Sequence, residues 1–398
     1  MRALNGLRML DLTHMLAGPY ATMLLADLGI ETIKIEPPDQ GEGTRILLAD
    51  NPAYSLHGMG AYFLTLNRNK KSVTLNLKSA RGLAIFYDLV KVSDVVVNNF
   101  SAGVTQRLKI DYPHLSAINP RVITCTITGF GETGPSKDWP AFDLVAQGMG
   151  GGMSITGRPG DPPLRAGMPI GDIGGGLMAV IGVLAALVAR QQTGRGQHVD
   201  ISMLDAQISM LSYAVTMYYL SGVVPTQQGN GHFLHIPYNT YPTQDGWIIV
   251  AVIVDEFWKN LVQVLDLHEL DTEENETASG RAHNADRINA ALAEKFKTNT
   301  QAHWLEALRA ARVPCAPVYD LGQAVSNPQV LHRRMIVEVA HPQGGQVCQT
   351  GNPVKLSDTY EDVFDPPPLV GQHTEEVLGG LLGMSASEIA ALRAEGVI

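Results

Sequence analysis

The chain has 398 residues, of which 45% are hydrophobic and 17% charged, with a formal net charge of -10. This length usually divides into two domains, and the composition is that of a packed globular protein. The negative charge argues against a general nucleic-acid binder, which needs a basic surface to displace counterions. Three isolated cysteines, Cys125, Cys315 and Cys348, predict neither a disulfide framework nor structural zinc. The first residues lack the layout of a signal peptide, so we expect a cytoplasmic protein.

The first two hundred residues alternate between strand-like and helix-like segments. Strands are predicted at 7–12, 32–35, 72–77, 95–98, 122–128 and 197–201, and helices at 19–28, 80–92 and 175–191. This alternation predicts a mostly parallel sheet covered by helices on both faces, an α/β fold. The longest apolar run, 173–189, is Gly-rich and slightly short for a membrane span, which favours a buried helix.

The pattern changes after Met203. A helix at 203–220 and a Gly- and Pro-rich loop at 221–242 precede a strand at 247–254 and helices at 256–265, 285–297 and 300–311. We assign 221–324 to a smaller α/β domain. Residues 1–220 and 325–398 form a split large domain that includes 203–220 as a linker helix. The tail after Pro366 is too short to fold alone, so we expect it to pack on the large domain.

Common nucleotide and hydrolase motifs are absent. The turn after the first predicted strand, Thr13–Pro19, holds one glycine instead of GxGxxG, and neither a P-loop nor a GxSxG elbow occurs. His232 and His235 have HxxH spacing but no acidic or cysteine partners nearby, so they are a weak metal candidate. We expect no metal site.

Asp172 stands where the longest apolar helix begins. The simplest interpretation is a capping aspartate, whose carboxylate accepts hydrogen bonds from free backbone N–H groups. Three glycines follow it, Gly174 to Gly176, although glycine costs a helix about 1 kcal/mol relative to alanine. Bare backbone of this kind suggests close approach of a large ligand, with N–H groups that can stabilise oxyanions. A carboxylate beside them can also act as a covalent nucleophile.

Short motifs in a fixed order along nearly the whole chain carry a family resemblance. They are Leu10–Thr13, Ala17–Pro19, Asp27–Gly29, Ile33–Glu36, Asn67–Ser72, Asn99–Phe100, Gly129–Gly131, Thr133–Pro135, Asp143–Gln147, Gly171–Asp172, Thr193–Gly196 and Gly371–Thr374. With these motifs the chain resembles the class III CoA-transferases, a family that includes formyl-CoA transferase, carnitine CoA-transferase and the α-methylacyl-CoA racemases. The resemblance implies a Rossmann-like large domain, a small domain from the middle of the chain, and a homodimer of two interlocked chains.

The resemblance also implies roles for individual residues. The nucleophile of the family falls on Asp172, which would form an aspartyl-CoA thioester. The CoA-binding positions fall on His14, Ala17, Leu75, Lys78, Asn99, Phe100, Arg107, Leu108 and Met203. No cofactor is implied beyond the substrate CoA and its acyl thioesters. Candidate substrate-binding positions are Arg45, Phe142, Arg165, Gly229, Gly231 and His235.

Departures from the family pattern reduce the number of candidate substrates and reactions. Pro37, Leu16 and Phe142 replace an arginine, a glutamine and a tyrosine of formyl-CoA transferase, which argues against formyl-CoA and oxalate as substrates. The racemase branch is the alternative, but it places a histidine before the aspartate at position 143, where this chain has Phe142.

In its short sequence motifs, the chain is most similar to the succinyl-CoA-dependent dicarboxylate transferases. The shared stretches are Asn67–Ser72, Ile236–Tyr238, Asn327–Leu331 and Pro366–Pro368. The expected donor is therefore succinyl-CoA. The expected acceptor is a short diacid such as itaconate, mesaconate, citramalate, malate or glutarate, with its second carboxylate held by a cation. No nucleic-acid or membrane partner is expected.

Overall fold

The structure, a computed structural model, describes residues 1–398 and separates into two compact units. The large unit comprises Met1–Gly152, Arg165–Ser221 and Gln329–Ile398, and the small unit comprises Met153–Leu164 and Gly222–Pro328. The sequence analysis placed 153–164 and 325–328 in the large domain, which differs from this division. The first of these segments joins the small unit because the Gly229 N–H donates to the carbonyl of Gly157.

A six-stranded parallel sheet forms the centre of the large unit. Its strands are β1 (Arg8–Asp11), β2 (Glu31–Glu36), β5 (Lys70–Thr74), β6 (Val95–Asn98), β7 (Ile123–Thr128) and β8 (His198–Ser202). They lie in the order β5-β2-β1-β6-β7-β8, so the chain reverses its direction of progress across the sheet between β1 and β6. The six predicted strands match these six closely, because buried parallel strands are short runs rich in Val and Ile.

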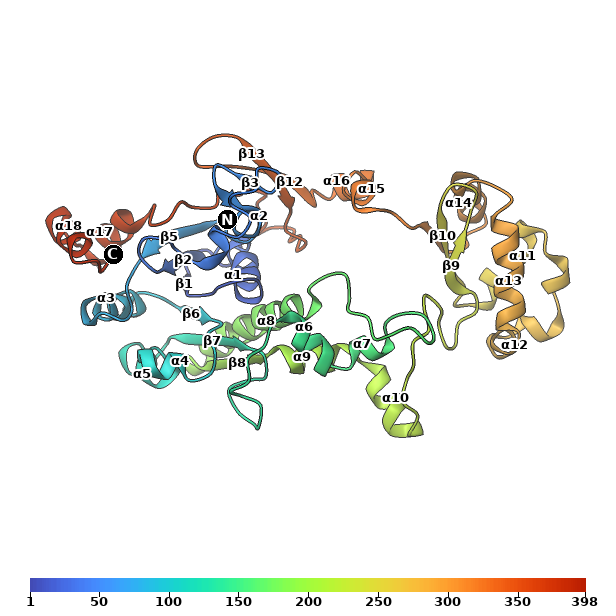
Figure 1. Ribbon diagram of the computed structural model, residues 1–398, viewed down its shortest axis with the longest axis horizontal. Helices are drawn as coiled ribbons and strands as arrows, with labels where there is room; N and C mark the ends of the chain where they lie inside the picture. The colour runs from blue at the N-terminus through green and yellow to red at the C-terminus, as the bar shows by residue number, and fades with distance from the viewer. The chain divides into compact units, whose positions relative to one another are not determined.

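Helices cover both faces of this sheet (Figure 1). The helices of the large unit are α1 (Ala17–Asp27), α2 (Ala61–Leu66), α3 (Ala80–Lys91), α4 (Val104–Leu108), α5 (Tyr112–Ile118), α6 (Asp143–Met149), α8 (Ile170–Thr193), α9 (Met203–Met210), α10 (Tyr213–Ser221), α16 (Pro328–His332, its first residue in the small unit), α17 (Thr374–Leu382) and α18 (Ala386–Ala394). Alternate strand residues enter two separate cores, Met9 facing α1 and α8, and Leu10 facing α3, α5, α17 and α18. The architecture is therefore a three-layer α/β fold.

The last residues of the chain complete the large unit. The His373 N–H donates to the carbonyl of Ser72, and the Asn76 N–H donates to the carbonyl of Val397. Helices α17 and α18 supply Leu378 and Leu392 to the core beneath β5. Two short hairpins, β3 (Ser55–Leu56) with β4 (Met59–Gly60) and β12 (Ile336–Ala340) with β13 (Gln346–Thr350), also belong to this unit and were not predicted.

The predicted linker helix 203–220 is wrong in one respect, because it consists of two helices. Helix α9 ends at Met210 and α10 begins at Tyr213. Ser212 between them has a φ of 50°, a left-handed conformation that a continuous helix excludes.

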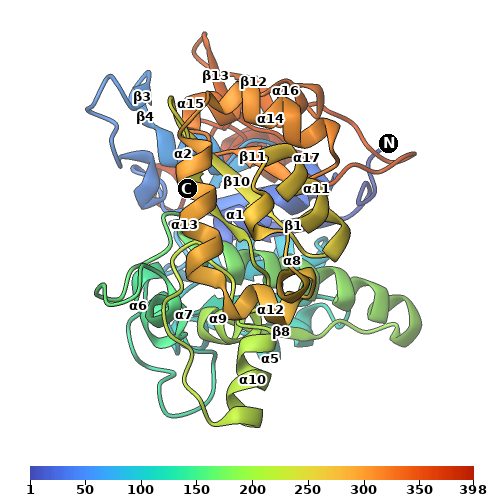
Figure 2. The same ribbon diagram turned by 90° about the vertical axis from the view of Figure 1, so that its right-hand side faces the viewer.

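The small unit has its own sheet and core. Strands β9 (Tyr238–Pro242), β10 (Trp247–Ala251) and β11 (Cys315–Pro317) form an antiparallel sheet in the order β11-β10-β9. The helices are α7 (Gly152–Ile155, its first residue in the large unit), α11 (Asp255–Leu265), α12 (Ala278–His283), α13 (Ala285–Phe296), α14 (Gln301–Ala310) and α15 (Leu321–Val325). Helices α13 and α14 pack on this sheet (Figure 2). Trp258, Phe296 and Trp304 dominate the core.

Helix α8 is long and apolar enough to cross a membrane by length and composition alone. A helix that packs on a sheet can meet the same criteria. Helix α8 packs on α1, α9, β7 and β8, and its buried Arg190 pairs with Asp94 at 2.9 Å. Helix α8 was predicted to be buried, but it is only partly so. Leu177, Ile181 and Val188 are exposed on the single chain.

Candidate active site

A cavity of about 750 Å³ lies in the large unit beyond the carboxyl ends of β1, β6, β7 and β8. Its lining comes from 14–17 after β1, 99–102 after β6, 127–129 at the end of β7, and Met203 after β8. Asp172, in the first turn of α8, also contributes. The cavity therefore occupies the point where the strand order reverses, which is where open α/β sheets bind their ligands.

Asp172 is the third residue of α8, and its carboxylate has neither a cation nor a hydrogen-bond donor beside it. The side chain is half-buried, which raises its pKa to about 6, and the negative charge of Asp143 acts in the same direction. The cavity thus holds a carboxylate that is more basic than usual and has no partner within the protein.

Asp143, the first residue of α6, caps helix α8 in place of Asp172. Its Oδ1 accepts hydrogen bonds from the N–H groups of Gly171 at 2.8 Å and Asp172 at 3.3 Å, and its Oδ2 accepts one from Gln147 at 2.7 Å. The interpretation of Asp172 as the capping residue is therefore wrong. Because Asp143 occupies these N–H groups, the N–H groups of the second and third residues of the helix are not free to stabilise an oxyanion.

The glycines that follow Asp172 serve helix packing. A Cβ on Gly176 would lie 2.8 Å from the carbonyl oxygen of Ala17, and one on Gly174 would collide with Met210. A Cβ on Gly175 would lie 3.0 Å from Met203. The glycines allow α1 and α9 to approach α8 closely, so our inference that they face a large ligand is not supported by these contacts.

The cavity brings together five of the nine expected CoA-binding residues: His14, Ala17, Asn99, Phe100 and Met203. The other four lie elsewhere on the large unit. Leu75 is 2% exposed and belongs to the core, and Leu108 packs partly against it. Lys78 lies between β5 and α3, and Arg107 lies in α4. None of these four lines the cavity.

The six candidate substrate-binding residues fall into three groups. Phe142 and Arg165 line the cavity. Arg45 does not, because its buried guanidinium pairs with Glu36 at 2.6 Å and donates to the carbonyl of Pro368 at 2.9 Å. Since its donors are used inside the fold, Arg45 is not available for a substrate carboxylate. Gly229, Gly231 and His235 belong to the small unit.

Several cavity residues have no role in the sequence analysis. They include Tyr62, Lys137, Asp138, Trp139 and Asp143. Lys137 and Arg165 are exposed cations for which the structure shows no ion pair. The sequence signal for Lys137 is weak, because this residue lies between two of the family motifs, Thr133–Pro135 and Asp143–Gln147, and in neither of them.

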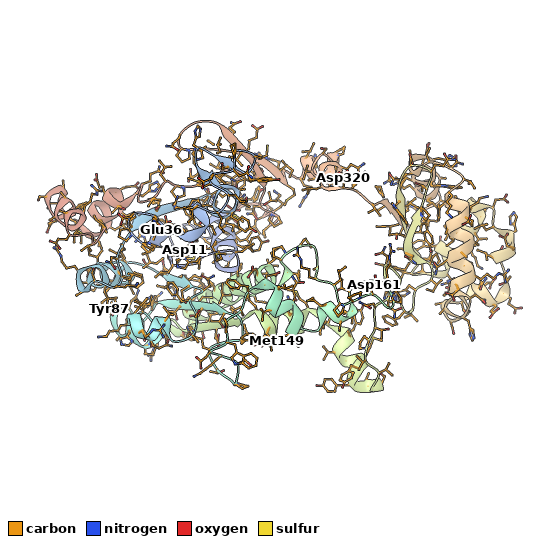
Figure 3. All side chains as sticks on the ribbon, viewed as in Figure 1. Asp11, Glu36, Tyr87, Met149, Asp161 and Asp320 are labelled. Atoms are coloured by element: carbon orange, nitrogen blue, oxygen red, sulfur yellow. The ribbon has the colours of Figure 1, made fainter.

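A buried ionic cluster holds the turn that carries His14, where the Lys34 ammonium donates to the carbonyl of Thr13. Asp11 and Glu36, the last residues of β1 and β2, lie in the large unit (Figure 3). The Asp11 carboxylate is completely buried and pairs with the Lys70 ammonium at 2.9 Å. It also accepts hydrogen bonds from the hydroxyl groups of Thr13 and Thr22. Burial alone would raise the pKa of Asp11, but Lys70 and Lys34 hold it well below its usual range.

The family model for CoA-transferase family III matches residues 4–374. The chain belongs to CoA-transferase family III. It is 34% identical to the human succinyl-CoA:glutarate CoA-transferase over 398 residues, covering all of this chain and 90% of that protein. It is 38% identical to the acetyl-CoA:oxalate CoA-transferase of Acetobacter aceti over 365 residues, covering 91% of each. Its structure matches that of a CAIB/BAIF family protein from Brucella suis, with a TM-score of 0.85, 34% identity, and coverage of 96% and 99% of the two chains.

This family III CoA-transferase thus has the mixed α/β architecture expected from its sequence, with the parallel sheet of its large unit intact. Its enzyme class follows from the family model and from relatives named as CoA-transferases. The cavity with Asp172, of about 750 Å³, contains the end of β7 together with the start of α8.

Proposed function

We propose that this transferase moves CoA from succinyl-CoA to a short dicarboxylic acid, with Asp172 as the covalent nucleophile. One observation carries the proposal: Asp172 is an unpaired carboxylate with a pKa of about 6 in the cavity beyond the strand ends. At pH 7 such a group is mostly ionised, yet it is a stronger nucleophile than an ordinary aspartate.

The proposed reaction proceeds through four acyl exchanges. A carboxylate oxygen of Asp172 attacks the thioester carbonyl, the C–S bond breaks, and a mixed anhydride and CoA thiolate result. The thiolate attacks the aspartyl carbonyl and releases succinate, leaving an aspartyl-CoA thioester. The acceptor carboxylate attacks this thioester, and the thiolate leaves as a second anhydride forms. The thiolate then attacks the acceptor carbonyl, which regenerates Asp172 and gives the new acyl-CoA. No net proton is transferred, and exclusion of water preserves the activated acyl group.

Two unpaired cations support a dicarboxylate acceptor. Lys137 and Arg165 line the same cavity as Asp172, so a diacid with one carboxylate at Asp172 could place the other beside a cation. The relatives described above are named for glutarate and oxalate, which are both dicarboxylates. The relative named for oxalate is 38% identical, so the substitutions at Leu16, Pro37 and Phe142 do not remove oxalate from the candidates. Oxalate therefore joins itaconate, mesaconate, citramalate, malate and glutarate in the substrate panel.

We also propose that the enzyme works in the cytoplasm as an interlocked homodimer and needs no cofactor beyond CoA. Leu177, Ile181 and Val188 form an exposed apolar row along one side of α8. Helix α10 adds exposed Tyr213, Tyr219 and Leu220. A second copy of the chain is the proposed occupant of these surfaces, because isolated apolar patches of this kind mark interfaces.

A charge placed in this row tests the dimer. Ile181→Lys should shift the molar mass in sedimentation velocity toward the monomer, because an unpaired ammonium would be buried in the interface. Lys91→Ala, at the exposed end of α3, is the control and should leave the mass unchanged. A monomeric wild-type protein would contradict the dimer.

Intact-protein mass spectrometry tests the nucleophile. After incubation with succinyl-CoA, the wild-type protein should gain the mass of a covalent CoA adduct, and peptide mapping should locate it at Asp172. Asp172→Asn should gain none, whereas Asp138→Asn, which changes another carboxylate in the cavity, should still form it. Transfer activity in Asp172→Asn would contradict the mechanism. Deuterium incorporation at the substrate α-carbon without acid exchange would instead support the racemase alternative.

A further inference from the structure

Glu42 carries a buried carboxylate oxygen without a hydrogen-bond donor. The residue lies between β2 and the 3₁₀ turn Gly43–Arg45, and its side chain is 1% exposed. Its Oε1 accepts from the Thr44 hydroxyl, but its Oε2 has no hydrogen-bond partner. The nearest donor-bearing ring is that of His14, whose Nδ1 lies 3.9 Å from this oxygen. Buried acceptors are normally satisfied, so this gap indicates a hydrogen bond that a small movement of the His14 ring would complete.

The remainder of His14 is already held in place. The Asn99 side chain accepts from the His14 N–H at 2.8 Å and donates to the His14 carbonyl at 2.8 Å. The Phe100 ring lies 5.4 Å from the imidazole, centroid to centroid. Since the backbone is fixed and the ring is supported by Phe100, the freedom left to His14 is a small ring movement and the choice of tautomer. His14 also lines the cavity, so this choice is presented to any bound ligand.

The charges around the pair keep the imidazole neutral. Burial and the Lys34 ammonium lower the pKa of His14 to about 4, while Asp11 and Glu36 oppose this shift. Burial raises the pKa of Glu42, against the effect of the nearby Lys34. A neutral imidazole carries a proton on one nitrogen and a lone pair on the other. Which ring nitrogen carries the proton depends on the hydrogen-bond partner that the other ring nitrogen has.

We propose that Glu42 is a positioning residue that keeps the His14 proton on Nδ1. Its Oε2 accepts a hydrogen bond from Nδ1–H when the 3.9 Å gap closes by about 1 Å, a normal hydrogen-bond distance. Nε2 then carries the lone pair and accepts from a donor in the cavity. The donor is an amide N–H of the pantetheine arm of acyl-CoA, which rests on the proposed function of this cavity.

Glu42→Gln tests the assignment with little change in shape. Thr44 donates to one side-chain oxygen, so the new amide oxygen should stay on that side and the NH₂ group should face His14. An NH₂ donor requires an unprotonated Nδ1, which moves the proton to Nε2 and removes the acceptor from the cavity. Thr44→Val is the matched control, because it removes the hydroxyl that donates to Glu42 Oε1 and leaves Oε2 in place.

Two readouts are expected to change together. Nitrogen-15 NMR of the unliganded wild-type protein, assigned with His14→Gln, should show His14 protonated at Nδ1, and Glu42→Gln should show it protonated at Nε2. The KM for succinyl-CoA should rise about ten-fold in Glu42→Gln with kcat within about two-fold, as for the loss of one hydrogen bond. Thr44→Val should keep the wild-type tautomer and KM.

Four results decide the proposal. A wild-type His14 protonated at Nε2, or a Glu42→Gln variant with unchanged tautomer and KM, overturns it. A Glu42→Gln variant whose only change is a lower Tm also overturns it, because Glu42 would then be structural. Wild-type protein with the Nδ1–H tautomer but no binding of succinyl-CoA supports the role of Glu42 and contradicts the proposed function of the cavity.

Discussion

Asp11 and Asp172 are both withdrawn from solvent within the large unit, yet they have opposite electrostatic surroundings. Asp11, at the end of β1, pairs with Lys70 and accepts two hydroxyl hydrogen bonds, and its pKa is held well below the ordinary range. Asp172, at the start of α8, has no cation beside it, and its pKa rises to about 6. The charge that acts on the pKa of Asp172 is that of another carboxylate, Asp143.

In these two aspartates, the charge of the neighbouring group, more than burial, distinguishes a carboxylate that stabilises the fold from one that can react. Burial alone would raise the pKa of either aspartate. The positive charges of Lys70 and Lys34 lower the pKa of Asp11 despite its burial. The negative charge of Asp143 raises the pKa of Asp172 further. Perturbed, unpaired groups in a cavity are candidates for chemistry, and paired groups in a core are not.

The largest expected effect is on catalysis. Asp172→Asn should lower kcat by at least about 10⁴-fold, the scale seen when a covalent nucleophile is removed. The same change should leave Tm equal or raise it, because it removes an unpaired charge that already lies beside Asp143. Initial-rate kinetics and thermal unfolding check both parts. A lower Tm with near-normal activity would reverse the assigned roles of the two aspartates.

Breaking the ion pair at Asp11 should have the next largest effect, and it should be on stability. Lys70→Met leaves a buried carboxylate without its closest cation and should cost about 3–5 kcal/mol of unfolding free energy. Urea unfolding measures this loss. The double variant Asp11→Asn, Lys70→Met should recover part of it, since no buried charge is then uncompensated. Equal stability of Lys70→Met and wild type would show that the pair is not structural.

Asp143→Asn should change the pH dependence of the reaction. Asp172 must be ionised to attack, so kcat/KM should fall as pH drops through about 6, where the folded protein takes up a proton. Asparagine can still accept hydrogen bonds at the start of α8 but removes the negative charge. The acidic limb of the pH profile should therefore move to lower pH. A limb that stays near 6 would assign the whole shift to burial.

Thr22→Val should have the smallest effect. The Thr22 hydroxyl donates to Asp11 at 2.9 Å and accepts from Lys70 at 2.8 Å, so it links the two members of the pair. Its loss should reduce the unfolding free energy by about 1–2 kcal/mol, because each buried group loses one partner. Urea unfolding should show this without any change in the pH profile of activity.

The central sheet could be predicted because each strand has a local signal. Short runs of β-branched residues, separated by helical periodicity, are enough to place β1, β2, β5, β6, β7 and β8. The position of the cavity beyond the carboxyl ends of the strands follows the rule for open α/β sheets, whereas the order of the strands was not predicted. Asp172 was identified because the glycines and the family motifs lie beside it in the sequence.

The remaining site features depend on contacts between distant segments. Arg45 could be read as a substrate cation because nothing local reveals that Glu36 and Pro368 use its guanidinium. Asp143 looked like one residue of a motif, and only the fold places its carboxylate at the start of α8. The glycines of α8 suggested a ligand, although the groups that approach them are α1 and α9. The sequence therefore identified candidate residues, but their contact partners depend on the tertiary structure.

The discontinuous large unit has a consequence for synthesis on the ribosome. Residues 222–328 form most of a core of their own and emerge before α17 and α18, which cover β5. The small unit can therefore fold while the sheet that precedes it still lacks part of one helical layer. Contacts such as Ser72 with His373 close across about 300 residues, which is slow and leaves apolar strand surface exposed meanwhile. Nascent chains stalled before residue 374 should therefore be the species most dependent on chaperones.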